Sequence, residues 1–176
     1  MENDNKQNGM IDESFRALNE RHNRIYQFVL MYNNYIFSTH DYGMGIPLTM
    51  IEAHTLTYIE DNPGCTATDL IYYWNRTKGS ISQIVSHLEK SGLVEKRKKE
   101  GNKKTLYLYV TKLGAQLSKA HKLYDTIDIA KTMEHLKKEC TAEEIESFYK
   151  VLDVYNQVIR KDFEINAGHR SEKDAK

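Results

Sequence analysis

Residues 66–92 read TATDLIYYWNRTKGSISQIVSHLEKSG, and this stretch decides the fold. Thr66 and Thr77 each precede a short run with apolar residues at helical spacing, which is where a hydroxyl caps a helix. The first run ends in a tight turn at Asn75-Arg76, and Ser91-Gly92 stop the second. The second run carries an apolar stripe made of Ile81, Ile84, Val85 and Leu88. Two short capped helices separated by a turn of a few residues predict a helix-turn-helix.

A further helix is expected before this stretch and a β-hairpin after it. Thr49 and Glu52 form a capping-box pattern, which predicts a helix that ends near Asn62-Pro63-Gly64. After a glycine-containing tip, Glu100-Gly101-Asn102, Tyr107 and Tyr109 alternate with Leu106, Leu108 and Val110. With residues 93–99 this alternation predicts a two-stranded hairpin, the wing of a winged helix.

Long helices flank this core. Residues 11–37 place apolar side chains at alternating steps of four and three, a heptad seam. A helix of this length, about 40 Å at the standard rise, cannot bury its seam within a small domain, so it needs a partner helix. Thr111 is expected to cap a second long helix, and Thr141 with Glu144 to open a third with a similar seam. The seam residues assigned to a dimer interface are Phe15, Leu18, Ile25, Phe148, Leu152, Tyr155 and Ile159.

The expected fold is therefore mainly α with a small β-hairpin wing: a winged helix-turn-helix with long N- and C-terminal dimerisation helices. Residues 1–9 and 168–176 are polar and are predicted to be disordered tails. Residues 10–47 are expected to form the N-terminal dimerisation helix and a loop, and 48–111 the winged helix-turn-helix DNA-binding domain. Residues 112–167 would supply the C-terminal helices that complete the dimerisation domain.

The chain as a whole is neutral, with 25 basic and 25 acidic residues among its 176. Its charge is unevenly distributed, because Arg76 to Lys112 contain ten basic and three acidic residues, a net charge of +7. A charge run alone often marks only a solvated surface. Here it coincides with the second helix of a helix-turn-helix and with the hairpin, which is the electrostatic footprint of a DNA-binding protein.

The helix from Lys78 to Lys90 is expected to read double-stranded DNA. Small polar side chains opposite its apolar stripe let it enter the major groove, where Gln83 can pair with adenine, and Ser82 and Ser86 with several base edges. Thr77 and the first helical amides suit phosphate, and the hairpin lysines suit the backbone or the neighbouring minor groove. An ordinary surface helix is the alternative explanation of the serines. The predicted DNA contacts are Arg76, Thr77, Lys78, Gly79, Ser80, Ser82, Gln83, Ser86, His87, Lys98, Lys99, Lys103 and Lys104.

Together these segments resemble the MarR family, the multiple-antibiotic-resistance regulators. The resemblance covers about 70 residues and is carried by residues 48–49, 66–70, 77–83, 88–94 and 110–114. It implies a homodimer built by the first helix and the last two. It also implies binding to a near-palindromic operator, one recognition helix per half-site, with repression as the usual outcome. In many members a small molecule between the dimer helices and the DNA-reading heads releases the DNA.

The wing departs from the family pattern. Wings of this family commonly carry an arginine at the tip that enters the minor groove, whereas this tip is Glu100-Gly101-Asn102-Lys103-Lys104. Lysine lacks the planar guanidinium fork, so the minor-groove arginine role does not transfer to this chain.

Twelve tyrosines occur in the chain, and tyrosine suits aromatic or phenolic ligands. The cleft between the first, second and fifth helices is the expected effector site. Core packing and dimer contacts are the alternative explanation of the same side chains. The candidate effector residues are Tyr26, Tyr32, Tyr35, Tyr58 and Tyr124.

No cofactor and no metal site are expected from the sequence. The histidines show no His-x-x-x-His spacing on one helix, the usual local sign of a metal site. A zinc site built from residues far apart in the chain is the alternative. The histidines considered are His40, His54, His87, His121 and His135.

Other classes of function find little support in the sequence. It contains no glycine-rich phosphate loop, nucleophile elbow or paired-carboxylate pattern, so an enzyme is not expected. Cys65 and Cys140 lie far apart, which fits a reducing cytoplasm, and each is expected to be inert. No signal peptide or membrane-spanning run is seen, and we expect a cytoplasmic protein. The alternative function is a winged-helix protein-interaction module without specific DNA binding.

Overall fold

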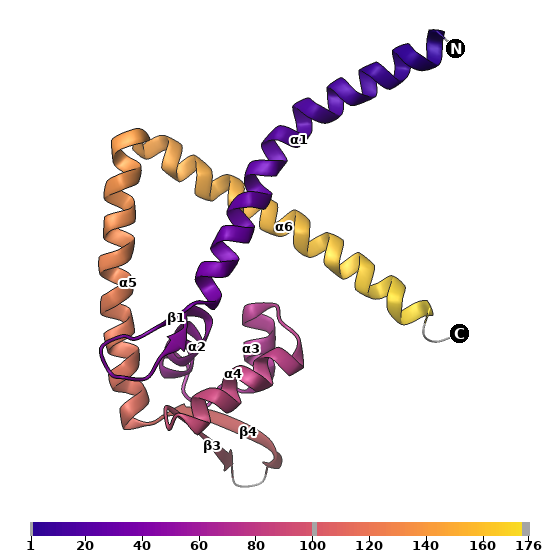
Figure 1. Cartoon of the computed structure of the whole chain (residues 1–176). Coiled ribbons are helices and arrows are strands. Elements are labelled where there is room, and N and C mark those ends of the chain that lie inside the picture. The colour runs from indigo at the N-terminus through magenta and orange to yellow at the C-terminus, as the bar shows by residue number, and fades with distance from the viewer. Residues whose placement is uncertain (1, 100–101, 174–176) are drawn as a thin grey trace. The chain divides into compact units, whose positions relative to one another are not determined.

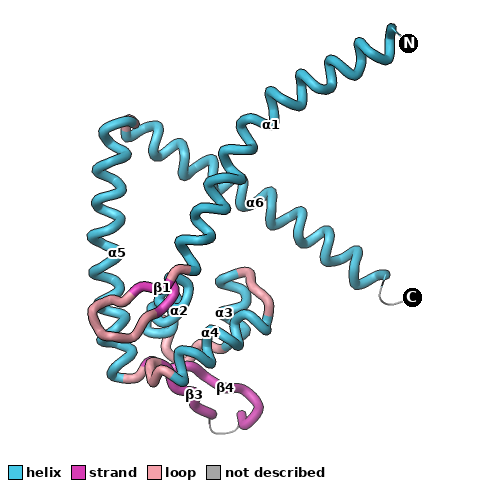
Figure 2. Tube along the Cα trace, viewed as in Figure 1, coloured by secondary structure: helices cyan, strands magenta, loops and turns pink. Residues whose placement is uncertain are grey.

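The computed structural model describes residues 2–99 and 102–173, and it is mostly helical with two small strand pairs (Figures 1 and 2). It divides into two compact units, Met1–Tyr124 and Asp125–Lys176, so the boundary falls within one long helix. The elements in chain order are α1 (Glu2–Phe37), β1 (Thr39–His40), β2 (Leu48–Thr49), α2 (Met50–Asp61), α3 (Ala67–Trp74), α4 (Lys78–Lys90), β3 (Val94–Lys99), β4 (Asn102–Val110), α5 (Lys112–Glu139) and α6 (Ala142–Lys173).

The predicted helix-turn-helix is confirmed in the first unit. The N-cap hydroxyls of Thr66 and Thr77 accept hydrogen bonds from the amides of Asp69 and Ser80, so α3 and α4 begin where the sequence places them. Asn75 ends α3 in the left-handed conformation, with φ of 48°. The predicted stripe of α4 is buried, and it packs into one core with the other helices of this unit. The largest fully buried apolar side chains of that core are Leu48, Leu56, Ile59, Leu70, Ile81, Leu88, Leu93, Leu108 and Leu117.

The predicted wing is confirmed as the antiparallel pair of β3 and β4. Val94 lies opposite Val110, and the register is irregular between Arg97 and Lys99. The chain before α3 extends this pair, because Cys65 and Leu108 form a bridge in which the Leu108 amide donates to the Cys65 carbonyl at 2.8 Å. The wing is thereby fixed to the start of the helix-turn-helix as well as to its end.

The start of α5 is locked to the turn after α4. Thr111 donates its hydroxyl proton to the Gly92 carbonyl at 2.7 Å, and its oxygen accepts from the Gly114 amide at 3.0 Å. Gly114 lies so close to the Leu93 backbone that a Cβ added there would meet the Leu93 carbonyl oxygen at 2.0 Å. Only glycine fits at this contact, so α5 leaves the wing in one fixed direction.

Two features of the first unit differ from the sequence predictions. The segment expected to be a loop contains a strand pair at its ends, since Thr39 pairs with Thr49 and His40 with Leu48. Between these strands the Asp41 carboxylate accepts hydrogen bonds from the amides of Gly43, Met44 and Gly45 at 2.9 to 3.0 Å. Two-residue strands carry too little alternation to be recognised in a sequence.

The tails were predicted wrongly for most of their length. α1 begins at Glu2, so residues 2–9 are helical, and α6 extends to Lys173, so residues 168–173 are helical. Met1 and residues 174–176 lie outside the described part of the chain. The physical reason is that extending an existing helix costs far less than nucleating one, so polar residues at its ends can continue it.

The second unit contains the rest of α5 and α6. Thr141 caps α6 as predicted, because its hydroxyl and amide both bond to the Glu144 carboxylate at 2.9 and 2.8 Å. This contact lowers the pKa of Glu144, chiefly through the hydrogen bond from the Thr141 backbone. No helix in the described ranges has an apolar stretch long enough to cross a membrane.

Candidate nucleic-acid interface

The outward face of α4 is polar, and from Lys78 to Leu88 it carries no acidic side chain. Ser82 and Gln83 are exposed, on the side opposite the buried stripe. Lys78 and Gly79 are exposed in the first turn, while Ser80 and Ser86 are half-buried. A Cβ added at Gly79 would meet no atom within 4 Å, so the helix start is open to an approaching backbone. Gln83 and its neighbours therefore lie on the exposed face of α4.

His87 differs from the other members of the predicted set because it is engaged within the protein. Its Nδ1 lies 2.6 Å from Oε1 of Glu52 on α2. The other carboxylate oxygen of Glu52 accepts from the Thr49 amide and hydroxyl at 2.9 and 2.8 Å. Glu52 thus caps α2 and holds α4 at once. The sequence analysis missed this role because the two residues are 35 positions apart and no local pattern links them.

Arg76 is also engaged within the protein. Its guanidinium lies 5.0 Å from the ring centroid of Phe37 at the end of α1, a cation–π contact. The side chain is half-buried, so Arg76 joins the turn of the helix-turn-helix to α1 in addition to any contact with phosphate.

The wing holds a row of cations over tyrosine rings. Lys99 Nζ lies 4.1 Å from the Tyr107 ring centroid, and the Arg97 guanidinium lies 4.6 Å from that of Tyr109. Arg97 also pairs with Glu95. Arg97 is not among the predicted DNA contacts. Its position two residues before Lys99 on the strand places both side chains on the same face of the hairpin. The wing therefore contains an arginine, placed along the strand instead of at the tip.

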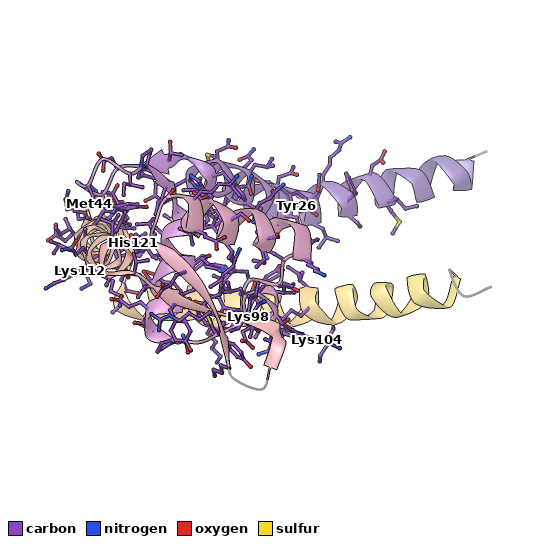
Figure 3. All side chains as sticks on the ribbon, turned by 90° about the horizontal axis from the view of Figure 1, so that it is seen from below. Tyr26, Met44, Lys98, Lys104, Lys112 and His121 are labelled. Atoms are coloured by element: carbon purple, nitrogen blue, oxygen red, sulfur yellow. The ribbon has the colours of Figure 1, made fainter. Side chains whose placement is uncertain are left out.

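The remaining wing lysines lie on the two strands. Lys98 and Lys104 are exposed, and Figure 3 shows both on the hairpin. Lys96, nearer the helix, bonds to Glu89 at 2.6 Å. The side chain of Lys103 and the tip residues Glu100 and Gly101 lie outside the described part of the structure.

The five candidate effector tyrosines do not form one group. Tyr35 and Tyr124 both contact His40, with ring centroids 5.7 and 6.1 Å away. Tyr32 contacts Tyr35 at 5.9 Å and so extends this group along α1. The group also includes Tyr42, which sequence analysis missed and whose ring lies 5.3 Å from Tyr124.

Tyr26 and Tyr58 make other contacts. Tyr26 has His22 as its ring neighbour at 6.5 Å, and Tyr58 has Tyr73 at 4.3 Å. Burial is the main cause that raises the pKa of Tyr58, followed by nearby Cys65. A surface hollow of about 420 Å³ opens elsewhere, beside α5, and no candidate tyrosine lines it. Its lining residues are Glu60, Lys112, Ala115, Gln116, Lys119 and Lys122.

The residues assigned to dimerisation are apolar side chains exposed on their helices. On α1 Phe15 is 62% exposed and Leu18 67% exposed. On α6 Phe148 is 53% exposed and Ile159 48% exposed. The remaining members, Ile25, Leu152 and Tyr155, are also exposed within the single chain.

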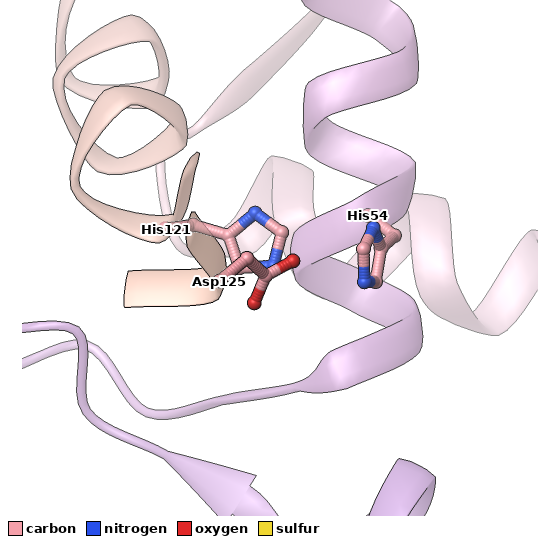
Figure 4. A group of neighbouring side chains, drawn as sticks. All are labelled: His54, His121 and Asp125. Atoms are coloured by element: carbon pink, nitrogen blue, oxygen red, sulfur yellow. The ribbon is translucent and has the colours of Figure 1, made fainter. Parts of the chain in front are cut away.

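The structure brings together three side chains that could hold a metal ion and that the sequence analysis did not connect. They are His54 on α2 with His121 and Asp125 on α5, and their ligand atoms all lie within 4.8 Å of one another (Figure 4). His121 and Asp125 are one helical turn apart, so their nearness could have been predicted from the sequence. His54 is distant in sequence, so its position depends on the fold.

Cys65 has the surroundings of a structural thiol. It is buried, and burial is the main cause that raises its pKa to about 11, with the charge of Asp69 adding to the effect. The thiolate is the reactive form, so the environment of Cys65 suppresses its reactivity near neutral pH.

Comparisons with known proteins agree with this geometry. A family model described as MarR family matches residues 45–104. The uncharacterised HTH-type transcriptional regulator YhjH of Bacillus subtilis is 32% identical over 84 residues, covering 48% of this chain and 48% of that protein. The HTH-type transcriptional regulator PetP of Rhodobacter capsulatus is 34% identical over 86 residues, covering 48% of this chain and 47% of PetP. The chain thus spans about half the length of the curated relatives it matches.

A solved structure extends the comparison beyond the winged helix. The crystal structure of Streptococcus pneumoniae FabT in complex with DNA superposes with a TM-score of 0.59 at 22% identity, covering 84% of this chain and 98% of FabT. At that identity the likeness concerns the fold. Residues 45–104 of this chain therefore form a winged helix-turn-helix that is similar to that of the MarR family.

Proposed function

We propose that this chain is a DNA-binding transcriptional regulator that works as a homodimer. The observation that carries the proposal is the outward face of α4, where exposed Ser82 and Gln83 stand opposite a fully packed stripe. The same unit carries a basic hairpin with exposed Lys98 and Lys104. That combination suits the major groove of duplex DNA.

Each part of the surface has a distinct task in this proposal. Gln83 reads a base, because its amide can donate to and accept from the edge of adenine. The start of α4, with Thr77 and Lys78, receives a phosphate at the positive end of the helix. Lys98 and Lys104 follow the phosphate backbone along the wing. His87 supports α4 through Glu52 and is a minor DNA contact.

Dimerisation is supported by the apolar faces of α1 and α6. α1 has 36 residues, which correspond to about 54 Å of helix. It exposes large apolar side chains along most of that length. Contiguous exposed apolar surface on this scale marks an interaction site. A second copy of the chain is the proposed partner, so two α4 helices would read a near-palindromic operator.

The proposed outcome is repression, relieved by a small aromatic ligand. The aromatic group of Tyr35, His40, Tyr42 and Tyr124 is the proposed effector site, because it joins the end of α1 to α5 near the DNA-reading core. Tyr26 and Tyr58 are left out of this site because their ring contacts lie elsewhere.

Sequencing the DNA that co-purifies with the chain tests the proposal. We expect recovery of one short near-palindromic sequence, with a relaxed base preference at the position that Gln83 reads when Gln83→Ala is used. The control is Lys150→Ala, which removes an exposed cation from α6 and should recover the same sequence. Recovery of unrelated fragments by the unmodified chain would instead indicate an interaction module without specific DNA binding.

A further inference from the structure

We propose that His54, His121 and Asp125 form a binding site for one divalent transition-metal ion of the zinc type. Two imidazoles and one carboxylate are a donor set that zinc and its neighbours accept, leaving a fourth position for water or another ligand. Magnesium and calcium prefer all-oxygen sites, so they fit this set poorly.

The positions of the three side chains suit an ion. His121 is only 1% exposed, while His54 and Asp125 are half-buried. Asp125 follows His121 by one turn of α5, so the continuous helix itself places both on one face. His54 stands on α2 with its ring centroid 4.7 Å from that of His121. Ligand atoms of a tetrahedral zinc site lie about 3.3 Å apart when the metal–ligand bonds are about 2.0 Å. The ligand atoms of these three side chains lie within 4.8 Å of one another. Rotation of the side chains would bring them to the distance that zinc requires.

A hydrogen-bond chain sets the orientation of His121. Ser118 donates its hydroxyl proton to Glu60 at 2.6 Å, and its oxygen lies 3.1 Å from that of Thr57. Thr57 donates its own proton to the Ala53 carbonyl at 3.1 Å. The Thr57 oxygen lies 3.3 Å from Nδ1 of His121, so it accepts from Nδ1–H. This tautomer leaves the lone pair of His121 on Nε2.

The chain of partners continues to a charged pair. Oε2 of Glu60 also accepts a hydrogen bond from Nζ of Lys122 at 2.9 Å, and Lys122 bonds to Asp61 at 2.9 Å. Partners of this kind fix the ring orientation of a metal-bound histidine and increase its basicity.

Aromatic rings surround the three ligands. The ring of Tyr42 lies edge-on to His121 with centroids 5.0 Å apart, and Trp74 lies edge-on to His54 at 6.4 Å. Rings of this size limit the access of water and lower the local dielectric, which strengthens the attraction between a cation and the Asp125 carboxylate. The site would join α2 of the winged helix to α5.

Titration of the full chain, without a histidine tag, against Zn²⁺ in competition with a chromophoric chelator tests the proposal. We expect one tight ion per chain, a higher melting temperature with Zn²⁺ that a chelator reverses, and the intense visible absorption of tetrahedral Co²⁺ when cobalt replaces zinc. These readouts measure the metal directly, so they stand whether or not the chain binds DNA.

Three variants assign the ligands. His54→Gln and Asp125→Asn should each weaken zinc binding by more than the roughly 10- to 100-fold that loss of an outer hydrogen-bond partner causes. Thr57→Val removes only the hydroxyl beside His121, so its effect should fall within that roughly 10- to 100-fold range. The control His135→Gln changes an exposed histidine farther along α5 and should bind zinc as the unmodified chain does.

Two results would overturn the proposal. One is the absence of tight zinc binding by the folded, unmodified chain. The other is tight binding that survives both His54→Gln and Asp125→Asn, because the ion would then occupy a different place. Circular dichroism of each variant separates loss of ligands from loss of fold.

Discussion

Nδ1 of His87 and Oε1 of Glu52 lie 2.6 Å apart and join helix α4 to the first turn of α2. The same carboxylate closes the capping box of Thr49. The angle at which α4 is presented therefore depends on a residue that lies outside the helix-turn-helix. In the proposed function, His87 therefore holds the reading helix in place, while Gln83 reads a base.

His87→Ala and Gln83→Ala should have different effects on DNA binding. Loss of Gln83 should cost about 1–3 kcal/mol of discrimination at one base pair, since a bidentate contact is removed. Loss of His87 should leave base preference unchanged and slightly lower the melting temperature. Binding to a set of operators with single base changes measures both effects. Relaxed preference in the His87 variant would contradict the supporting role given to it.

Gly114→Ala should destabilise the winged helix by about 1–3 kcal/mol or more, because the new methyl group meets the Leu93 carbonyl and must displace backbone. Gly79→Ala is the matched control, since its Cβ meets open space. That change should stabilise the helix by about 0.5–1 kcal/mol. Urea unfolding of both variants measures the difference. Equal stability of the two would show that α5 does not pack closely on the turn at Leu93.

Stability should fall in acid in part through Glu60. Burial alone would raise the pKa of Glu60, but hydrogen bonds from Ser118 and Lys122 outweigh it and lower the pKa below its ordinary value of 4.5. A carboxyl group with a lowered folded-state pKa contributes stability above its unfolded value, and this contribution is lost as the pH falls through the folded value. Glu60→Gln should therefore be less stable at neutral pH and lose less stability below 4.5. Melting temperatures of both proteins, measured from neutral pH to below 4.5, test this prediction. Parallel curves of melting temperature against pH would contradict the stabilising role of the Glu60 carboxylate.

Cys65 should react slowly with thiol reagents. Burial raises its pKa to about 11, so at pH 8 nearly all of it is the unreactive thiol. Alkylation followed by mass spectrometry should find Cys140 modified before Cys65. Peroxide should likewise leave DNA affinity unchanged. Rapid labelling of Cys65 in the folded protein would show that its surroundings open more readily than the structure indicates.

Local signals account for what the sequence predicts well. The caps at Thr49, Thr66, Thr77 and Thr141 depend on neighbours three residues away, so spacing alone reveals them. The stripe of α4 follows in the same way from helical periodicity. The helix-turn-helix and the wing can therefore be located from the order of the amino acids.

Contacts between distant residues account for what the sequence did not reveal. The bond of His87 to Glu52 and the approach of His54 to His121 depend on how α2 packs, which no short pattern encodes. The five tyrosines were grouped by composition, and the structure separates Tyr58 from Tyr35 because they contact different rings. Such positions follow only from packing in three dimensions.

The central claim is that two copies of α4 read a specific DNA sequence through Gln83 and its neighbours. The most direct test measures the affinity of the chain for DNA from its own upstream region and for a scrambled duplex of the same composition, together with the number of chains bound. The account predicts about a thousandfold or greater preference for the native duplex, two chains per site, and a much smaller preference for Gln83→Ala. Equal affinity for both duplexes, or a single bound chain, would contradict it.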